Sequence, residues 1–140
     1  MMAARDQGIS SVLFRNAIGH TLGLSITEYE ALSFITIKGT ATPTEIARYT
    51  SLTTGSTTTM LDRLERMGFV SRKANPSDRR GVLVEVNASY QEKAQPLVAG
   101  IQQAHRELLA TYSEEELKTI ADFLTRFTGN VSAATKEIEK

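Results

Sequence analysis

Four basic side chains lie close together in the stretch 71–80, and their chemistry is that of anion binding. They are Arg72, Lys73, Arg79 and Arg80, and the one acidic residue among them is Asp78. Guanidinium and ammonium groups donate charge-assisted hydrogen bonds to phosphate oxygens, so such a cluster can bind a polyanion such as a nucleic acid. The alternative is an ordinary solvated surface, with Arg72 and Lys73 at an exposed strand end.

The distribution of charge supports a polyanion more than its total does. The chain has 16 Lys/Arg and 16 Asp/Glu, for a formal net charge of +0. Residues 42–87 hold seven basic against five acidic residues, whereas residues 88–140 hold six against eight. Positive charge is therefore local, which favours nucleic-acid binding weakly.

A run of short polar residues, Thr54 to Thr59, offers hydroxyl groups instead of charge. Hydroxyls can bond phosphates or base edges, but they discriminate bases less well than arginine or asparagine does. The helix-terminal amide of Thr54 could add a phosphate contact. We expect the outer face to include Ser56, Thr57 and Thr58; the alternative is that these hydroxyls only cap and solvate the helix.

Arg63 lies about one turn beyond this run. Its guanidinium could reach a phosphate or a base edge. It could equally pair with the neighbouring acids Asp62 or Glu65 on a solvated face, and the sequence leaves both open.

The sequence lacks the residues that other kinds of chemistry require. The chain has no cysteine and two histidines, which excludes disulfides and thiolate metal sites. It has neither a glycine-rich phosphate loop nor a nucleophile elbow, so we expect no enzyme, no cofactor and no metal site. It has no apolar run of the roughly 18 to 20 residues that a membrane helix needs, and no secretory signal, so we expect a cytoplasmic protein.

The elements that position these groups begin with two helices joined by a turn. Thr42, Pro43 and Glu45 combine a cap, a proline at the first helical position and a capping-box acid. Thr53 can cap a second helix, Thr54 to Met67, which Gly68 would end.

A hairpin follows this helix pair. Residues 69–73 and 82–86 read as strands, and Pro76 and Gly81 supply turn chemistry between them. A helix-turn-helix followed by a basic hairpin is the outline of a winged helix, in which one helix enters a DNA major groove and the hairpin contacts the backbone or minor groove beside it.

Further amphipathic helices are expected on either side. One covers 9–22, a second opens at a capping box of Thr27 and Glu30, and the chain is helical from Ala88 to its end with a second start at Ser113. Their apolar stripes are too long for a small winged helix to cover. We expect them to form a dimer interface across a two-fold axis; the alternative is a monomeric bundle.

The chain resembles the MarR family of transcriptional regulators over essentially its whole length. The matching segments are Pro43–Ala47, Leu61–Arg72 and Asn75–Arg80, the last with the family's wing pattern of Asp78, Arg80 and Val84. The resemblance implies a mainly α fold with a small β-hairpin wing, a winged helix-turn-helix flanked by N- and C-terminal dimerisation helices. It places one domain over 1–140, with a DNA-binding lobe at 27–87 and dimerisation helices at 5–24 and 88–135.

The function that the resemblance implies is a homodimeric repressor on a pseudo-palindromic, double-stranded DNA operator. Asp78 and Arg80 would hold the wing, and Arg79 or Arg80 would reach DNA. The hydroxyl-only helix front departs from this picture. With the neutral charge, it favours the alternative of a protein-interaction module with vestigial DNA affinity.

The resemblance also implies a small aromatic or phenolic effector that binds between the dimerisation helices and the lobe. From position alone, residues that could line its pocket are Phe14, Ile18, His20, Tyr29 and Phe34.

Overall fold

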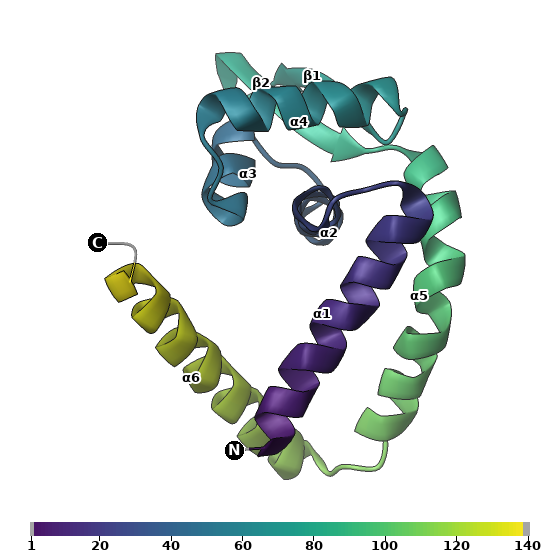
Figure 1. The fold of residues 1–140 in the computed structure, drawn as a ribbon, viewed down its shortest axis with the longest axis vertical. Coiled ribbons are helices and arrows are strands. Elements are labelled where there is room, and N and C mark those ends of the chain that lie inside the picture. Colours follow the sequence, from purple (N-terminus) through teal and green to yellow (C-terminus); the bar gives the residue numbers. More distant parts are fainter. Residues whose placement is uncertain (1, 139–140) are drawn as a thin grey trace. The chain divides into compact units, whose positions relative to one another are not determined.

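The computed structural model describes residues 2–138, except for the side chains of residues 79 and 80. The described chain forms six helices and one antiparallel hairpin (Figure 1). It divides into two compact units. The first ends at Leu97 and the second begins at Val98, both within α5. The elements are α1 (Met2–Leu22), α2 (Ile26–Lys38), α3 (Pro43–Thr50), α4 (Thr54–Arg66), β1 (Val70–Asn75), β2 (Asp78–Val86), α5 (Ala88–Leu109) and α6 (Glu114–Ile138).

Side-chain caps start three of the helices at the residues expected from the sequence. Thr42 and Glu45 form the expected capping box of α3, with Pro43 at its start. The Thr53 hydroxyl accepts from the Ser56 amide at the start of α4. At α6 the Ser113 amide donates to a Glu116 carboxylate at 2.8 Å, as expected.

The expected start of α2 at Thr27 is wrong by two residues. Ser25 is the N-cap, and its reciprocal partner is Glu28. Both Ser25 and Thr27 precede a glutamate by three positions, so the sequence offers two overlapping boxes. The structure uses Glu30 differently, in an ion pair with Arg15 of α1 at 2.8 Å, which leaves Glu28 to close the box.

The hairpin is longer than the sequence indicates. Its strands pair from Val70↔Val86 to Asn75↔Asp78, so Pro76 and Ser77 alone form the turn. The polar residues near the tip lack the apolar alternation by which strands are identified in a sequence. A short bridge joins the hairpin to the segment before α3, where the Val84 amide donates to the Ala41 carbonyl at 2.8 Å.

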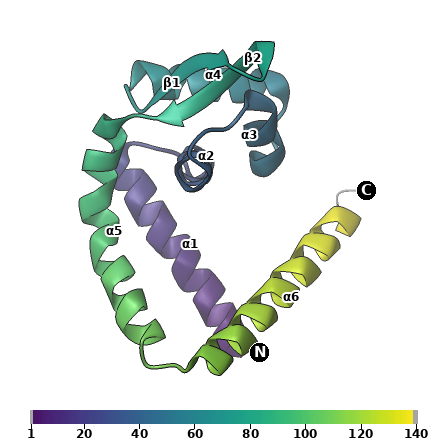
Figure 2. The same cartoon turned by 180° about the vertical axis from the view of Figure 1, so that it is seen from behind.

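One core unites these elements in the first unit. The hairpin lies against α4, behind it in Figure 1 and in front of it in Figure 2. This arrangement confirms the winged helix-turn-helix. Its large, fully buried apolar side chains come from α2, α3, α4 and both strands, namely Leu32, Ile35, Ile46, Leu61, Leu64, Val70 and Val84.

The second unit, which continues α5 and includes α6, presents apolar side chains to solvent. No residue of α6 is buried, and Phe123 stacks on Phe127 with ring centroids 5.8 Å apart. Among the described residues, no helix has both the length and the apolarity that crossing a membrane requires.

The α3 capping box makes stability depend on pH in a defined direction. The Lys38 ammonium, followed by the amide and hydroxyl of Thr42, lowers the pKa of Glu45 from 4.5 to about 2. A lowered pKa means that the carboxylate stabilises the fold fully above pH 4.5 and that this contribution is lost as pH falls towards 2. Glu45→Gln should therefore reduce the fall in unfolding free energy between pH 4.5 and 2, measured by urea denaturation. The control is Glu92→Gln, at an exposed position of α5, which should keep the wild-type dependence of unfolding free energy on pH.

Candidate nucleic-acid interface

The outer face of α4 carries most of the expected hydroxyls. Thr54, Ser56 and Thr58 are exposed, and so is Thr59, which the sequence analysis did not single out. Thr57 is 1% exposed and donates its hydroxyl to the Thr53 carbonyl at 2.9 Å.

The expectation that Thr57 lies on the outer face is therefore wrong. It sits four residues before Leu61 and seven before Leu64, both of which are buried in the core. A helix places residues at this spacing on one face. The helical period of the apolar residues could have shown this from the sequence alone.

Internal hydrogen bonds determine how the exposed hydroxyls can act. Thr58 donates to the Thr54 carbonyl at 3.0 Å, and Thr59 donates to the Gly55 carbonyl at 3.1 Å. With their protons engaged, these oxygens present lone pairs and so can accept from the amino groups of adenine or cytosine. Donation to a phosphate would require them to give up the bond to the helix.

The beginning of α4 offers donors for phosphate. Within the described part of the chain, the amides of Thr54 and Gly55 have no hydrogen-bond partner, as expected for the first turn of a helix. A Cβ built on Gly55 meets nothing within 4 Å, so a backbone could approach closely. The positive end of the helix dipole points to the same place.

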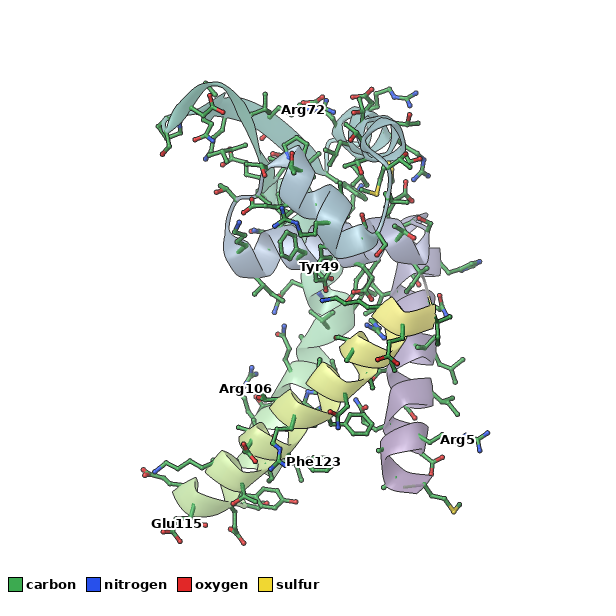
Figure 3. The ribbon with its side chains drawn as sticks, turned by 90° about the vertical axis from the view of Figure 1, so that its left-hand side faces the viewer. Arg5, Tyr49, Arg72, Arg106, Glu115 and Phe123 are labelled. Atoms are coloured by element: carbon green, nitrogen blue, oxygen red, sulfur yellow. The ribbon has the colours of Figure 1, made fainter. Side chains whose placement is uncertain are left out.

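Two of the basic residues expected to bind DNA form ion pairs with carboxylates of the protein itself. Arg72 of β1 lies between the hairpin and α4 (Figure 3), where it binds Asp62 at 2.6 Å and Glu65 at 2.5 Å. Burial would lower the pKa of Arg72, but the Asp62 hydrogen bond and the Glu65 charge outweigh burial and raise it. Lys73 pairs with Glu85 across the hairpin.

Arg63 is also paired, but with neither of the neighbours considered from the sequence. Its guanidinium forms an ion pair with Glu28 at the start of α2 and donates to the Gly23 carbonyl at 3.0 Å. These partners lie 35 and 40 residues away in the chain. Such a separation leaves no local signal in the sequence.

Gly81 lies in β2 just after the tip of the hairpin, close to two neighbouring side chains. A Cβ on Gly81 would lie 3.1 Å from a carboxylate oxygen of Asp78 and 3.2 Å from the side chain of Asn75, so a larger residue would require those side chains to shift. The backbone of residues 79 and 80 belongs to β2. Their side chains lie outside the description, so the roles expected for Arg79 and Arg80 stay predictions.

Two exposed arginines that the sequence analysis did not single out remain available. Arg48 on α3 and Arg66 on α4 form no ion pair with any described carboxylate. Within the residues that the structure describes, Arg66 donates only to the Asp62 carbonyl, at 3.3 Å.

The five residues expected to line an effector pocket are differently placed. Ile18 is 4% exposed, whereas Phe14 is 37% exposed and His20 is exposed. Tyr29 and Phe34 are half-buried, and Phe34 stacks on Tyr49 of α3 with centroids 4.4 Å apart. An open hollow of about 690 Å³ between the start of α2 and α4 contains none of the five in its lining.

Sequence comparisons identify the fold's family. The model of the MarR family matches residues 24–82. The HTH-type transcriptional regulator YcgE of Bacillus subtilis is 33% identical over 120 residues, which cover 86% of this chain and 78% of that protein. The multiple antibiotic resistance protein MarR of Escherichia coli is 33% identical over 108 residues, 75% of this chain and 74% of that one. The chain belongs to the MarR family.

Solved structures agree with this assignment. A mutant E. coli MarR complexed with operator DNA is similar with a TM-score of 0.56 and 25% identity, covering 91% of this chain and 94% of that chain. NadR in complex with 4-hydroxyphenylacetate has a TM-score of 0.66 at 17% identity, covering 90% and 87%, which shows a shared fold. This MarR-family protein is a DNA-binding transcriptional regulator, and its family is not one of enzymes.

Two consecutive threonines of α4, Thr57 buried and Thr58 exposed, test the placement of the interface. Thr58→Val should weaken binding to a selected operator fragment about two- to tenfold, the value of one hydrogen bond. Thr57→Val should leave the affinity within about twofold, because that side chain faces the core. Fluorescence anisotropy measures both variants, with thermal melting to check their folding. A larger loss from Thr57→Val than from Thr58→Val would contradict the placement.

Proposed function

We propose that this MarR-family regulator is a homodimeric repressor, which binds a pseudo-palindromic operator through α4 and the hairpin and is released by a small aromatic effector. The observation that carries the proposal is the exposed hydroxyl face of α4, with its free first-turn amides, on a lobe with a single hydrophobic core. A dimer that occupies two successive major grooves covers enough promoter DNA to exclude the transcription machinery. The protein would act in the cytoplasm, where its operator is.

The dimer rests on apolar surface that the described chain leaves in water. On α6 the exposed fractions are 57% for Phe123, 54% for Leu124 and 42% for Phe127, and on α1 Leu13 is 64% exposed. Burial of apolar area stabilises association by about 25 cal/mol per Å². A second copy would cover these helices and would set two α4 helices about 34–36 Å apart, the spacing of successive major grooves.

The internal pairing of Arg63, Arg72 and Lys73 leaves few cations for phosphate. We assign phosphate contacts to Arg79 and Arg80 at the hairpin and to the first-turn amides of α4. Specific affinity then depends on hydroxyl contacts and DNA shape more than on bulk charge.

The effector would be an aromatic or phenolic molecule. NadR, which shares the fold, is solved with 4-hydroxyphenylacetate. Among the five candidate residues, Phe14 and His20 of α1 are accessible and Tyr29 of α2 is partly so. An effector at these helices would act by binding more tightly to a dimer whose α4 helices are wrongly spaced.

The wing assignment predicts a change in salt dependence. Arg79→Ala with Arg80→Ala removes two phosphate contacts per protomer. The slope of log K, the DNA association constant, against log salt concentration should therefore become shallower by about 3 to 4 for a dimer. Anisotropy with the operator fragment between low and moderate salt measures this slope. The control, Arg5→Ala with Lys136→Ala, makes the same change of net charge on α1 and α6, outside α4 and the hairpin, and should keep the slope; Arg5 projects from α1 in Figure 3. An unchanged slope in the wing variant would show that the wing does not bind phosphate.

The dimer is tested at α6. Phe127→Glu places a charge in the proposed interface and should convert the protein to a monomer at micromolar concentration, measured by sedimentation velocity. Ile37→Glu, at an 88% exposed position of α2, is the matched control and should remain dimeric. A wild-type protein that sediments as a monomer would overturn the proposal.

A further inference from the structure

Arg63 connects α4 to two other segments of the lobe. One amino group forms the ion pair with Glu28 of α2, and the other donates to the Gly23 carbonyl in the turn between α1 and α2. Both terminal nitrogens of the guanidinium are therefore directed into the protein. A planar guanidinium holds two such partners in a fixed geometry, which a lysine ammonium cannot reproduce.

Glu28 is suited to hold this arginine in place. It is 7% exposed, and one carboxylate oxygen accepts from the Ser25 amide at 2.7 Å, which closes the capping box of α2. The other oxygen receives Arg63. A buried carboxylate needs a paired charge, so the first turn of α2 and the position of α4 depend on the same group.

The Gly23 carbonyl, the second group that Arg63 binds, also has a defined position. Gly23 has a φ of +69°, a left-handed conformation that favours glycine, and the following Leu24 amide donates to the Gly19 carbonyl at 2.8 Å. The carbonyl that Arg63 binds thus belongs to a tight turn with a defined path. Arg63 thereby fixes α4 against the end of α1 as well as against α2.

We propose that Arg63 is a positioning residue, which sets the placement of α4 for operator recognition without itself touching DNA. The proposal rests on the family's DNA binding and is independent of the dimer and the effector proposed above. Arg72 holds the same helix from the hairpin side through Asp62 and Glu65. Hydrogen bonds to base edges need donor–acceptor distances of about 2.7–3.2 Å and near-linear angles, so a small shift of α4 would cost specificity.

Glu28→Gln separates positioning from direct contact by the sign of its effect. If Arg63 positions α4, the neutral side-chain amide of the Glu28→Gln variant no longer forms the ion pair with Arg63, and α4 is held less firmly. The ratio of operator to non-operator affinity then falls about tenfold. If Arg63 binds DNA, removal of its carboxylate partner frees the cation, and operator binding tightens. The control is Glu30→Gln, which makes the same charge change on the same helix but removes the Arg15 partner instead; it should keep the ratio.

Arg63→Lys is the second variant and keeps the positive charge. A positioning role predicts a lower operator to non-operator ratio with an unchanged salt slope, because no phosphate contact is lost. A phosphate contact predicts that lysine retains the ratio and that Arg63→Ala makes the slope shallower by about 0.9 per protomer. Circular dichroism confirms that each variant is folded. Tighter operator binding by Glu28→Gln, or a ratio that Arg63→Lys preserves, would overturn the proposal.

Discussion

The placement of α4 depends on ion pairs that link it to the elements on either side. Arg63 joins it to Glu28 of α2, and Arg72 of β1 joins Asp62 and Glu65 on its other side. The Arg72 pairs are partly exposed, and such pairs contribute at most about 1 kcal/mol each to stability. The buried core stabilises the lobe, and it is non-directional. The pairs supply what the core lacks, a defined register for one helix that must meet DNA with ångström accuracy.

This use of arginine explains how a regulator of DNA can have a formal net charge of zero. Three of the basic residues in the lobe neutralise carboxylates of the same lobe, so they add little to its outward field. The exposed surface of α4 is then mainly hydroxyls, with free amides at its start and Arg66 near its end. Such a surface binds non-specific DNA weakly, because non-specific affinity comes from phosphate neutralisation.

Apolar side chains are exposed on helices near both ends of the chain. The winged-helix lobe buries a core and exposes the hydroxyls of α4, whereas Leu13 of α1 is 64% exposed and α6 buries none of its residues. A helix with long apolar side chains in water is stabilised mainly by packing against a partner. In the proposed dimer the same contact that covers α6 would fix the distance between two α4 helices. Dimerisation and DNA recognition would then be coupled by geometry, and an effector that changes the spacing would change the affinity.

The sequence by itself determined the elements and the family. Local signals fixed the caps at Thr42, Thr53 and Ser113, because capping depends on residues only three apart. The same local rule failed at α2, where two boxes overlap and only the use of Glu30 elsewhere decided between them. Tertiary structure alone assigned Arg63 to Glu28 across 35 residues, since no local pattern encodes such a pair. It therefore decided which basic side chains are left for DNA, a question of long-range pairing that residue type cannot answer.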